Sequence, residues 1–158
     1  MKKLLLIRHA KATHDTGFTD FERPLTAKGL AQCNTMVNRL TTNHIKPNHI
    51  VSSPALRTLT TADVFTKGLG LPTATHYPEI YDASESALLK VIYHLDDKYE
   101  FIALVGHNPG ISQVLYYLTG EYREVTTCAL ALIEFDAESW AELSENTGTL
   151  TYFDSPKD

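Results

Sequence analysis

The chain has 158 residues, of which 43% are hydrophobic and 21% are charged, and its formal net charge is −5. This length predicts one domain, residues 1–158, that buries enough surface to fold without a disulfide or a structural metal. The longest apolar run, residues 4–7, is too short for a membrane span or a secretory signal, and Cys33 and Cys128 lack metal-ligand spacing. We therefore expect a cytoplasmic protein in which both cysteines are small core residues.

The charge is divided unevenly along the chain. Residues 1–70 contain ten Lys/Arg and four Asp/Glu, whereas residues 71–158 contain four Lys/Arg and fifteen Asp/Glu. This balance argues against a general nucleic-acid binder but permits a site for a small anion in the basic part. Two solvated faces of opposite sign would give the same division, and charge alone favours that simpler interpretation.

Strands and helices alternate along the sequence. In chain order, the patterns predict a strand at 4–7, a helix at 26–42, a strand at 50–51, a helix after Ser53, a weak strand at 75–77, a helix carrying 88–95, a strand at 101–105, a helix carrying 111–118, and strands at 128–136 and 148–153, the last at an edge. This alternation predicts a three-layer α/β/α fold with a mostly parallel central sheet.

Three helix starts have recognisable capping signals. Ser53 and Asn108 are each followed by a proline, which is typical of an N-cap and the first helical position. Asp82 precedes Glu85 by three residues, so this pair resembles a capping box with Asp82 as the cap.

The same strand ends carry a concentration of cationic and imidazole side chains. The first strand ends at Arg8 and His9, the second leads to Arg57, and the strand at 101–105 ends at His107 and Asn108. Parallel strands would bring these residues to one edge, where arginine forks and helix N-termini favour a phosphoryl group. Each residue also has a simpler interpretation, such as Asn108 as a helix cap or Arg57 paired with an acid on its own helix.

A metal site or a nucleotide-phosphate loop explains these residues less well. No two histidines have the spacing of a helical zinc site, neighbouring arginines would repel a cation, and no Walker-type loop is present. The other histidines stand among polar residues and are expected at the surface: His14, His44, His49, His76 and His94.

Three segments together resemble a known family. Residues 6–10 (LIRHA), 52–58 (SSPALRT) and 105–110 (VGHNPG) resemble, in order, the signature blocks of the histidine phosphatase superfamily, which is phosphoglycerate mutase-like in fold. Ala10 stands where the family usually has Gly, and this variation, with residues 20–26 and 80–84, is similar to the SixA-type phosphohistidine phosphatase branch. The resemblance spans roughly residues 4 to 135.

The resemblance implies a phosphatase that works through a phosphohistidine intermediate and needs no metal or organic cofactor. His9 would be the nucleophile, and Arg8, Arg57 and His107 would bind the phosphoryl group and stabilise its transition state. Asn108 is placed with the substrate-binding residues.

The general acid is open between two carboxylates. Many relatives protonate the leaving oxygen with a carboxylate, and here Asp82 and Glu79 are the candidates, although Asp82 serves equally well as a helix cap. A leaving imidazole can be protonated before reaction, so phosphohistidine needs the acid less than a phosphoester does.

The short connection between residues 80 and 88 leaves little room for a segment covering the site. We therefore expect an open pocket that admits phosphohistidine on a protein, such as a histidine-containing phosphotransfer domain in signal transduction. The alternatives are a small-molecule phosphomonoesterase of the same fold and a non-catalytic module that binds phosphate or phosphopeptides. A binding module does not require the nucleophile His9, so the intact motif argues against it.

Overall fold

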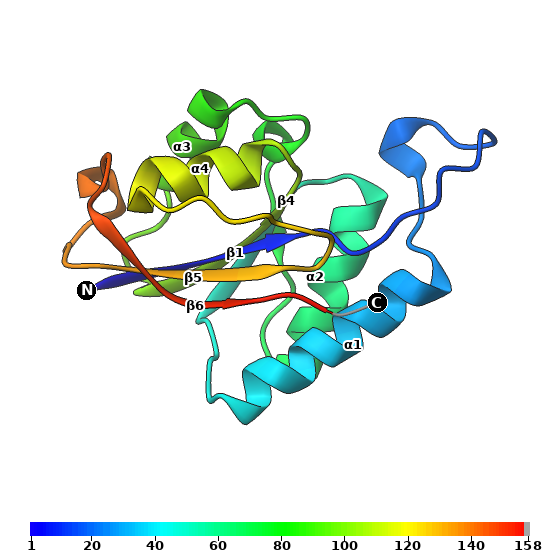
Figure 1. Cartoon of the computed structure of the whole chain (residues 1–158), viewed down its shortest axis with the longest axis horizontal. Helices are drawn as coiled ribbons and strands as arrows, with labels where there is room; N and C mark the ends of the chain where they lie inside the picture. Colours follow the sequence, from blue (N-terminus) through cyan, green and yellow to red (C-terminus); the bar gives the residue numbers. More distant parts are fainter. Residues whose placement is uncertain (157–158) are drawn as a thin grey trace.

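The computed structural model describes residues 1–156, and within this range six strands form one sheet (Figure 1). The sheet order is β3-β2-β4-β1-β5-β6, with bounds β1 Lys2–Arg8, β2 His49–Ser52, β3 Thr75–His76, β4 Phe101–Gly106, β5 Leu130–Phe135 and β6 Gly148–Asp154. Strands β1 to β4 pair in parallel, and β5 is antiparallel to both of its neighbours. The predicted mostly parallel sheet and the edge position of the last strand are confirmed.

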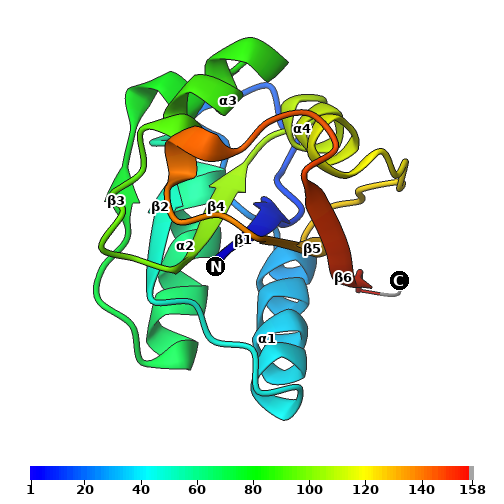
Figure 2. The same ribbon diagram turned by 90° about the vertical axis from the view of Figure 1, so that its left-hand side faces the viewer.

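Helices cover both faces of this sheet. Helices α1 (Ala27–Thr42) and α2 (Leu56–Leu69) lie on one face, and α3 (Glu85–Tyr93) and α4 (Gly110–Thr119) lie on the other, as Figure 1 and Figure 2 show. Short 3-10 turns η1 (Asp20–Glu22), η2 (Pro78–Ile80) and η3 (Trp140–Glu142) stand in the connections. The three predicted layers are confirmed. Within residues 1–156, no helix is long and apolar enough to cross a membrane.

The apolar run of β1 supplies both halves of the core. Leu4 and Leu6 join the cluster under α3 and α4, whereas Leu5 and Ile7 join the cluster under α1 and α2. All four are at most 1% exposed, which explains why this central strand is continuously hydrophobic rather than alternating. The strand is therefore fixed on both sides up to the point where its polar end begins.

Cys33 and Cys128 are free, fully buried members of the core under α1 and α2, as expected. Cys128 has a left-handed backbone (φ 61°), and its N–H donates to the carbonyls of Arg8 and His9. The core thus reaches directly beneath the end of β1.

The predicted start of α2 is wrong. The helix begins at Leu56, and Ala55 rather than Ser53 occupies the N-cap position. The reason is that Ser53 still pairs with β4, because its N–H donates to the Val105 carbonyl at 3.1 Å, so the turn into the helix needs two further residues. The Ser53 hydroxyl is therefore left for another role.

The capping box predicted at Asp82 is also wrong. Helix α3 is capped by Ser84, whose side chain accepts from the Ala87 N–H. Asp82 has φ 52°, a left-handed conformation that differs from the extended backbone of an N-cap. Its carboxylate is consequently not used by the helix.

The start of α4 partly follows the prediction. The helix begins at Gly110, and Pro109 occupies the N-cap position after a cis peptide bond, one residue before the position predicted for it. The Asn108 side-chain oxygen nevertheless accepts from the N–H of Ser112 at 3.1 Å and from its hydroxyl at 2.9 Å. Asn108 therefore does satisfy a backbone donor in the first turn.

Candidate active site

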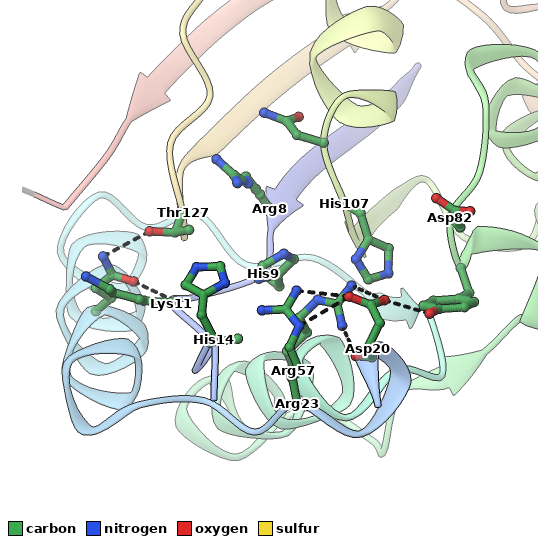
Figure 3. Close-up of a pocket in the computed structure, with 14 residues that line it drawn as sticks. Arg8, His9, Lys11, His14, Asp20, Arg23, Arg57, Asp82, His107 and Thr127 are labelled. Carbon is green, nitrogen blue, oxygen red and sulfur yellow. Dashed lines mark hydrogen bonds and ion pairs between the residues drawn. The ribbon is translucent and has the colours of Figure 1, made fainter. Parts of the chain in front are cut away.

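The carboxyl ends of β1, β2 and β4 meet at one edge of the sheet, as the sequence predicts. Arg8 pairs in register with Gly106, and Ser52 pairs with Val105. A pocket of about 580 Å³ opens there (Figure 3). Its lining includes six of the predicted site residues, namely Arg8, His9, Arg57, Asp82, His107 and Asn108.

His9 is a buried imidazole held in one orientation. It is 8% exposed, and its Nδ1 lies 2.7 Å from the Ala10 carbonyl oxygen. A carbonyl only accepts, so Nδ1 carries the proton and the lone pair is on Nε2. Burial, which is the largest cause, and the charges of Arg57 and Arg8 together lower the pKa of His9 to about 4, against the opposing effect of the Ala10 hydrogen bond. The ring is therefore neutral at pH 7.

The backbone beneath this imidazole is held by the core. The His9 N–H donates to the Gly106 carbonyl at 3.0 Å. The Ala10 N–H donates to the Thr61 hydroxyl at 3.0 Å, and that hydroxyl donates to the Arg57 carbonyl at 2.8 Å. Thr61 thereby links the segment that carries His9 to the helix that carries Arg57, and both are positioned by buried groups.

Asp20 connects the two arginines on one side of the pocket. Arg57 Nη1 donates to the Asp20 carbonyl at 2.6 Å, and Nη2 donates to its carboxylate at 3.1 Å. The same carboxylate accepts from the Tyr81 hydroxyl at 2.6 Å and from Arg23 Nε at 3.2 Å. These bonds, led by that from Tyr81, lower the pKa of Asp20 to about 2. Arg57 therefore pairs with an acid from η1, not with one on its own helix.

On the opposite side, Arg8 and Asn108 share one carbonyl. Arg8 Nη1 and Asn108 Nδ2 donate to the Val125 oxygen at 3.0 and 2.9 Å. The Asn108 side chain is thus bonded at both ends, through Nδ2 to the Val125 carbonyl and through Oδ1 to Ser112 of α4. Asn108 thus lines the pocket and orients the loop that Arg8 rests on.

Within residues 1–156, three buried side-chain nitrogen atoms have no hydrogen-bond partner: Arg8 Nε, Arg57 Nε and His107 Nδ1. Buried polar atoms are rarely left unpaired in folded proteins. All three belong to residues that line this one pocket. Three unpartnered nitrogens on residues of the pocket that also contains His9 favour a ligand rich in hydrogen-bond acceptors, such as an oxyanion.

His107 lies close to His9, with ring centroids 5.4 Å apart. Burial lowers the pKa of His107 to about 3, and the His9 and Arg57 charges act in the same direction. Its Nε2 is 2.8 Å from the Ser53 hydroxyl oxygen. Both histidines are therefore neutral at pH 7, and the positive charge of the site comes from the lining residues Arg8, Lys11, Arg23 and Arg57.

The structure separates the two candidate general acids. Asp82 lines the pocket, and Figure 3 shows it on the side of His107 away from His9. Glu79 is exposed and lines a different, mainly apolar hollow beside α3. Of the two carboxylates, Asp82 is the one that reaches the site. Among the described residues, no group of three or more His, Cys, Asp or Glu is arranged to hold a metal ion.

Several pocket residues carried no local signal in the sequence. Asp20 and Tyr81 lie in segments noted only for their family resemblance, and they meet across 61 positions of chain. His14 is exposed, as expected of a surface histidine, but it also lines the pocket. His49, also expected at the surface, is half-buried and stacks on Tyr99. Amphipathic periodicity does not report such long-range contacts.

Comparisons with known proteins agree with this geometry. Residues 4–79 match the model of the histidine phosphatase superfamily (branch 1). An uncharacterised protein of Mycobacterium leprae is 30% identical over 122 residues, which cover 72% of this chain and 71% of the relative.

Solved structures share the fold over nearly the whole chain. A candidate phosphohistidine phosphatase SixA from Agrobacterium tumefaciens has a TM-score of 0.84 at 24% identity and covers 98% of each chain. The protein histidine phosphatase SixA complexed with tungstate has a TM-score of 0.83 at 24% identity and covers 97% of this chain and 96% of its own. The predicted phosphoglycerate mutase-like fold is thereby confirmed.

Proposed function

Because this chain belongs to the histidine phosphatase superfamily, we propose that it is a metal-independent phosphatase. Its substrate is phosphohistidine on another protein, and the phosphoryl group is transferred first to His9 of this chain. The observation that carries the proposal is the set of three unpartnered buried nitrogens on Arg8, Arg57 and His107 around a neutral His9. A phosphoryl group bound in this pocket would supply acceptors for all three, and His9 lines the same pocket.

In the first step, the lone pair on His9 Nε2 attacks phosphorus. The bond from phosphorus to the leaving nitrogen or oxygen breaks, and the leaving group keeps the electron pair and takes up a proton. Arg8, Arg57 and His107 donate to the equatorial oxygens, where charge develops in a loose transition state. The Ala10 carbonyl holds the Nδ1 proton and stabilises the cationic ring that forms.

In the second step, water attacks the phosphorus of phospho-His9. The P–N bond breaks, the electron pair returns to Nε2, and inorganic phosphate leaves with the neutral imidazole restored. Both protons of the attacking water can leave with the phosphate, so this step balances without a base. Asp82 is the candidate to carry a proton to the leaving group in the first step. Asp20 is unsuitable for this task, because its carboxylate already accepts hydrogen bonds from Tyr81, Arg57 and Arg23.

Access to the pocket supports a protein substrate. Lys11, His14 and Asp20 at its rim are exposed, and only residues 81–84 connect η2 to α3 beside it. A phosphorylated side chain on another protein, such as a histidine-containing phosphotransfer domain in signalling, can enter from this side. The likeness to SixA structures, one of them a complex with the oxyanion tungstate, supports the same substrate class.

A second candidate is hydrolysis of small phosphomonoesters. It is favoured by Asp82, since a carboxylate in the pocket can protonate an alkoxide leaving group, which phosphohistidine does not require. Glu79 is not placed to do this.

The deciding experiment compares substrates and variants in the presence of a chelator. The protein is incubated with a phosphohistidine-bearing phosphotransfer domain, a phosphoserine peptide and a small alkyl phosphate, beside His9→Ala and the control His94→Ala at an exposed position in α3's C-cap. We expect turnover of phosphohistidine by the wild type and the control, none by His9→Ala, and an acid-labile phosphoenzyme in the wild type.

Other outcomes assign other functions. Full activity of His9→Ala would remove the nucleophile assignment, and preference for the alkyl ester would place the second candidate first. Phosphate binding without turnover of any substrate would identify a binding module.

A further inference from the structure

Ser53 faces His107 from the carboxyl end of β2. It is fully buried, and its backbone is fixed by the hydrogen bond from its N–H to β4. Its hydroxyl oxygen lies 2.8 Å from His107 Nε2 and accepts the Ala55 N–H at 3.2 Å. The hydroxyl is therefore held in position by two backbone hydrogen bonds, one from the Ser53 N–H to β4 and one from the Ala55 N–H to the hydroxyl oxygen.

The number of hydrogen atoms and lone pairs on Ser53 and His107 determines which of the two side chains donates. A serine hydroxyl has one hydrogen and two acceptor lone pairs, and Ala55 already uses one lone pair. Over residues 1–156, the only other group bonded to this oxygen is His107 Nε2. If Nε2 carried the proton and donated, the buried hydroxyl hydrogen of Ser53 would have no acceptor, which is costly in a buried site.

The opposite arrangement satisfies every atom. The Ser53 hydroxyl donates to Nε2, and the single proton of the neutral ring is then on Nδ1. That nitrogen is buried and has no partner in the described chain. Arg8 Nε and Arg57 Nε, the other two unpartnered nitrogens, can only donate. With Nδ1 protonated, all three are donors, whereas a lone pair on Nδ1 would repel a phosphoryl oxygen.

We propose that Ser53 is a positioning residue that holds the proton of His107 on Nδ1 and so makes this ring a donor to the phosphoryl group. The inference rests on the proposed function for its role in turnover, but the tautomer itself does not depend on any substrate. Ser53 acts through His107 and does not touch the phosphoryl group. Because both ring nitrogens of a neutral imidazole are chemically distinct, the arrangement is directly measurable.

The direct test is nitrogen-15 NMR of histidine-labelled protein at pH 7, with the His107 signals assigned by comparison with His107→Gln. In the wild type we expect the Nδ1–H tautomer. In Ser53→Ala, where nothing donates to Nε2, we expect the Nε2–H tautomer to become populated. An Nε2–H tautomer in the wild type would overturn the proposal, whatever the activity of the protein.

The kinetic test uses matched hydroxyl variants. Ser53→Ala is expected to lose about tenfold or more in kcat, comparable to removing one charge-assisted hydrogen bond in a transition state. Ser52→Ala removes the neighbouring buried hydroxyl, which donates to the Ser53 carbonyl and not to His107, and should retain kcat within about twofold. Ser53→Thr restores a hydroxyl and should regain most of the loss.

Two readouts keep the tests separate. Affinity for vanadate, measured without turnover, should fall in Ser53→Ala and return in Ser53→Thr, and thermal melting identifies any variant that does not fold. Wild-type kcat and vanadate affinity in folded Ser53→Ala would refute the positioning role. Absence of hydrolysis by the wild type would refute the proposed function, while the tautomer measurement would still decide the inference.

Discussion

Lowering the pH from 7 to 5 is expected to destabilise the folded protein through the two buried histidines of the pocket, His9 and His107. The folded-state pKa is about 4 for His9 and about 3 for His107, both lowered mainly by burial. An unfolded chain returns each to about 6.5. The unfolded state therefore binds more protons between these values, so stability is complete above about pH 6.5 and is lost as the pH falls toward 4.

The size of the effect follows from the same values. At pH 5 an unfolded histidine is about 97% protonated, whereas folded His9 is about 10% protonated, which costs about 2 kcal/mol relative to high pH. His107 adds a loss of similar size. A total of about 4 kcal/mol is a large part of the 5–15 kcal/mol typical of a domain. Asp20, with a pKa of about 2, does not contribute in this interval.

The assay is urea denaturation at pH 7 and pH 5, at matched ionic strength, for three proteins. The wild type should lose about 4 kcal/mol, and His9→Gln, which cannot titrate, should lose about half as much. His94→Gln at an exposed position should behave as the wild type. Equal stability of the wild type at both pH values would refute the reasoning, as would an unchanged loss in His9→Gln.

Three further predictions concern the pocket and its support. Asp20→Asn keeps an acceptor oxygen for Tyr81 but removes a negative charge from the pocket lining. Repulsion between two like charges is worth about 1 kcal/mol at about 4 Å in water, so vanadate should bind about fivefold more tightly at low salt. Unchanged vanadate affinity would contradict this. Gly29→Ala places a methyl group against the Lys11 carbonyl and should cost about 1–3 kcal/mol in denaturation, whereas Gly17→Ala, with open space around it, should be neutral. In steady-state assays, Asp82→Asn should slow alkyl phosphoester hydrolysis about 100-fold and leave phosphohistidine hydrolysis nearly unchanged. An equal loss of rate with both substrates would exclude a role of Asp82 in protonating the leaving group.

The fold and the central site residues were accessible from sequence because both depend on local patterns. The apolar run 4–7 and the strand at 101–105 are buried on both faces, and parallel pairing fixes where their polar ends meet. Arg8, His9 and His107 follow those strands directly, so their convergence required only the sheet order.

The remaining contacts are not local and could not be derived in this way. The Ser53-Pro motif has the composition of a helix cap, but pairing of Ser53 with β4 delays the helix and frees its hydroxyl for His107. The pairing of Asp20 with Arg57 spans 37 positions and depends on how the loop after β1 folds back over α2. Composition around either residue gives no indication of its partner.

The uneven charge of the chain acquires a specific meaning at this pocket. Four of the ten basic residues in the first 70 line it, and two carboxylates stand with them: Arg8, Lys11, Arg23, Arg57, Asp20 and Asp82. With His9 and His107 neutral, the lining carries two positive charges in excess, which is the charge that a phosphoryl dianion neutralises. Protonated histidines would bind the anion more strongly, but His9 would then lack the lone pair that attacks phosphorus in the proposed mechanism. The arginines therefore supply the binding charge, and their field adds to the burial that keeps the proposed nucleophile His9 neutral.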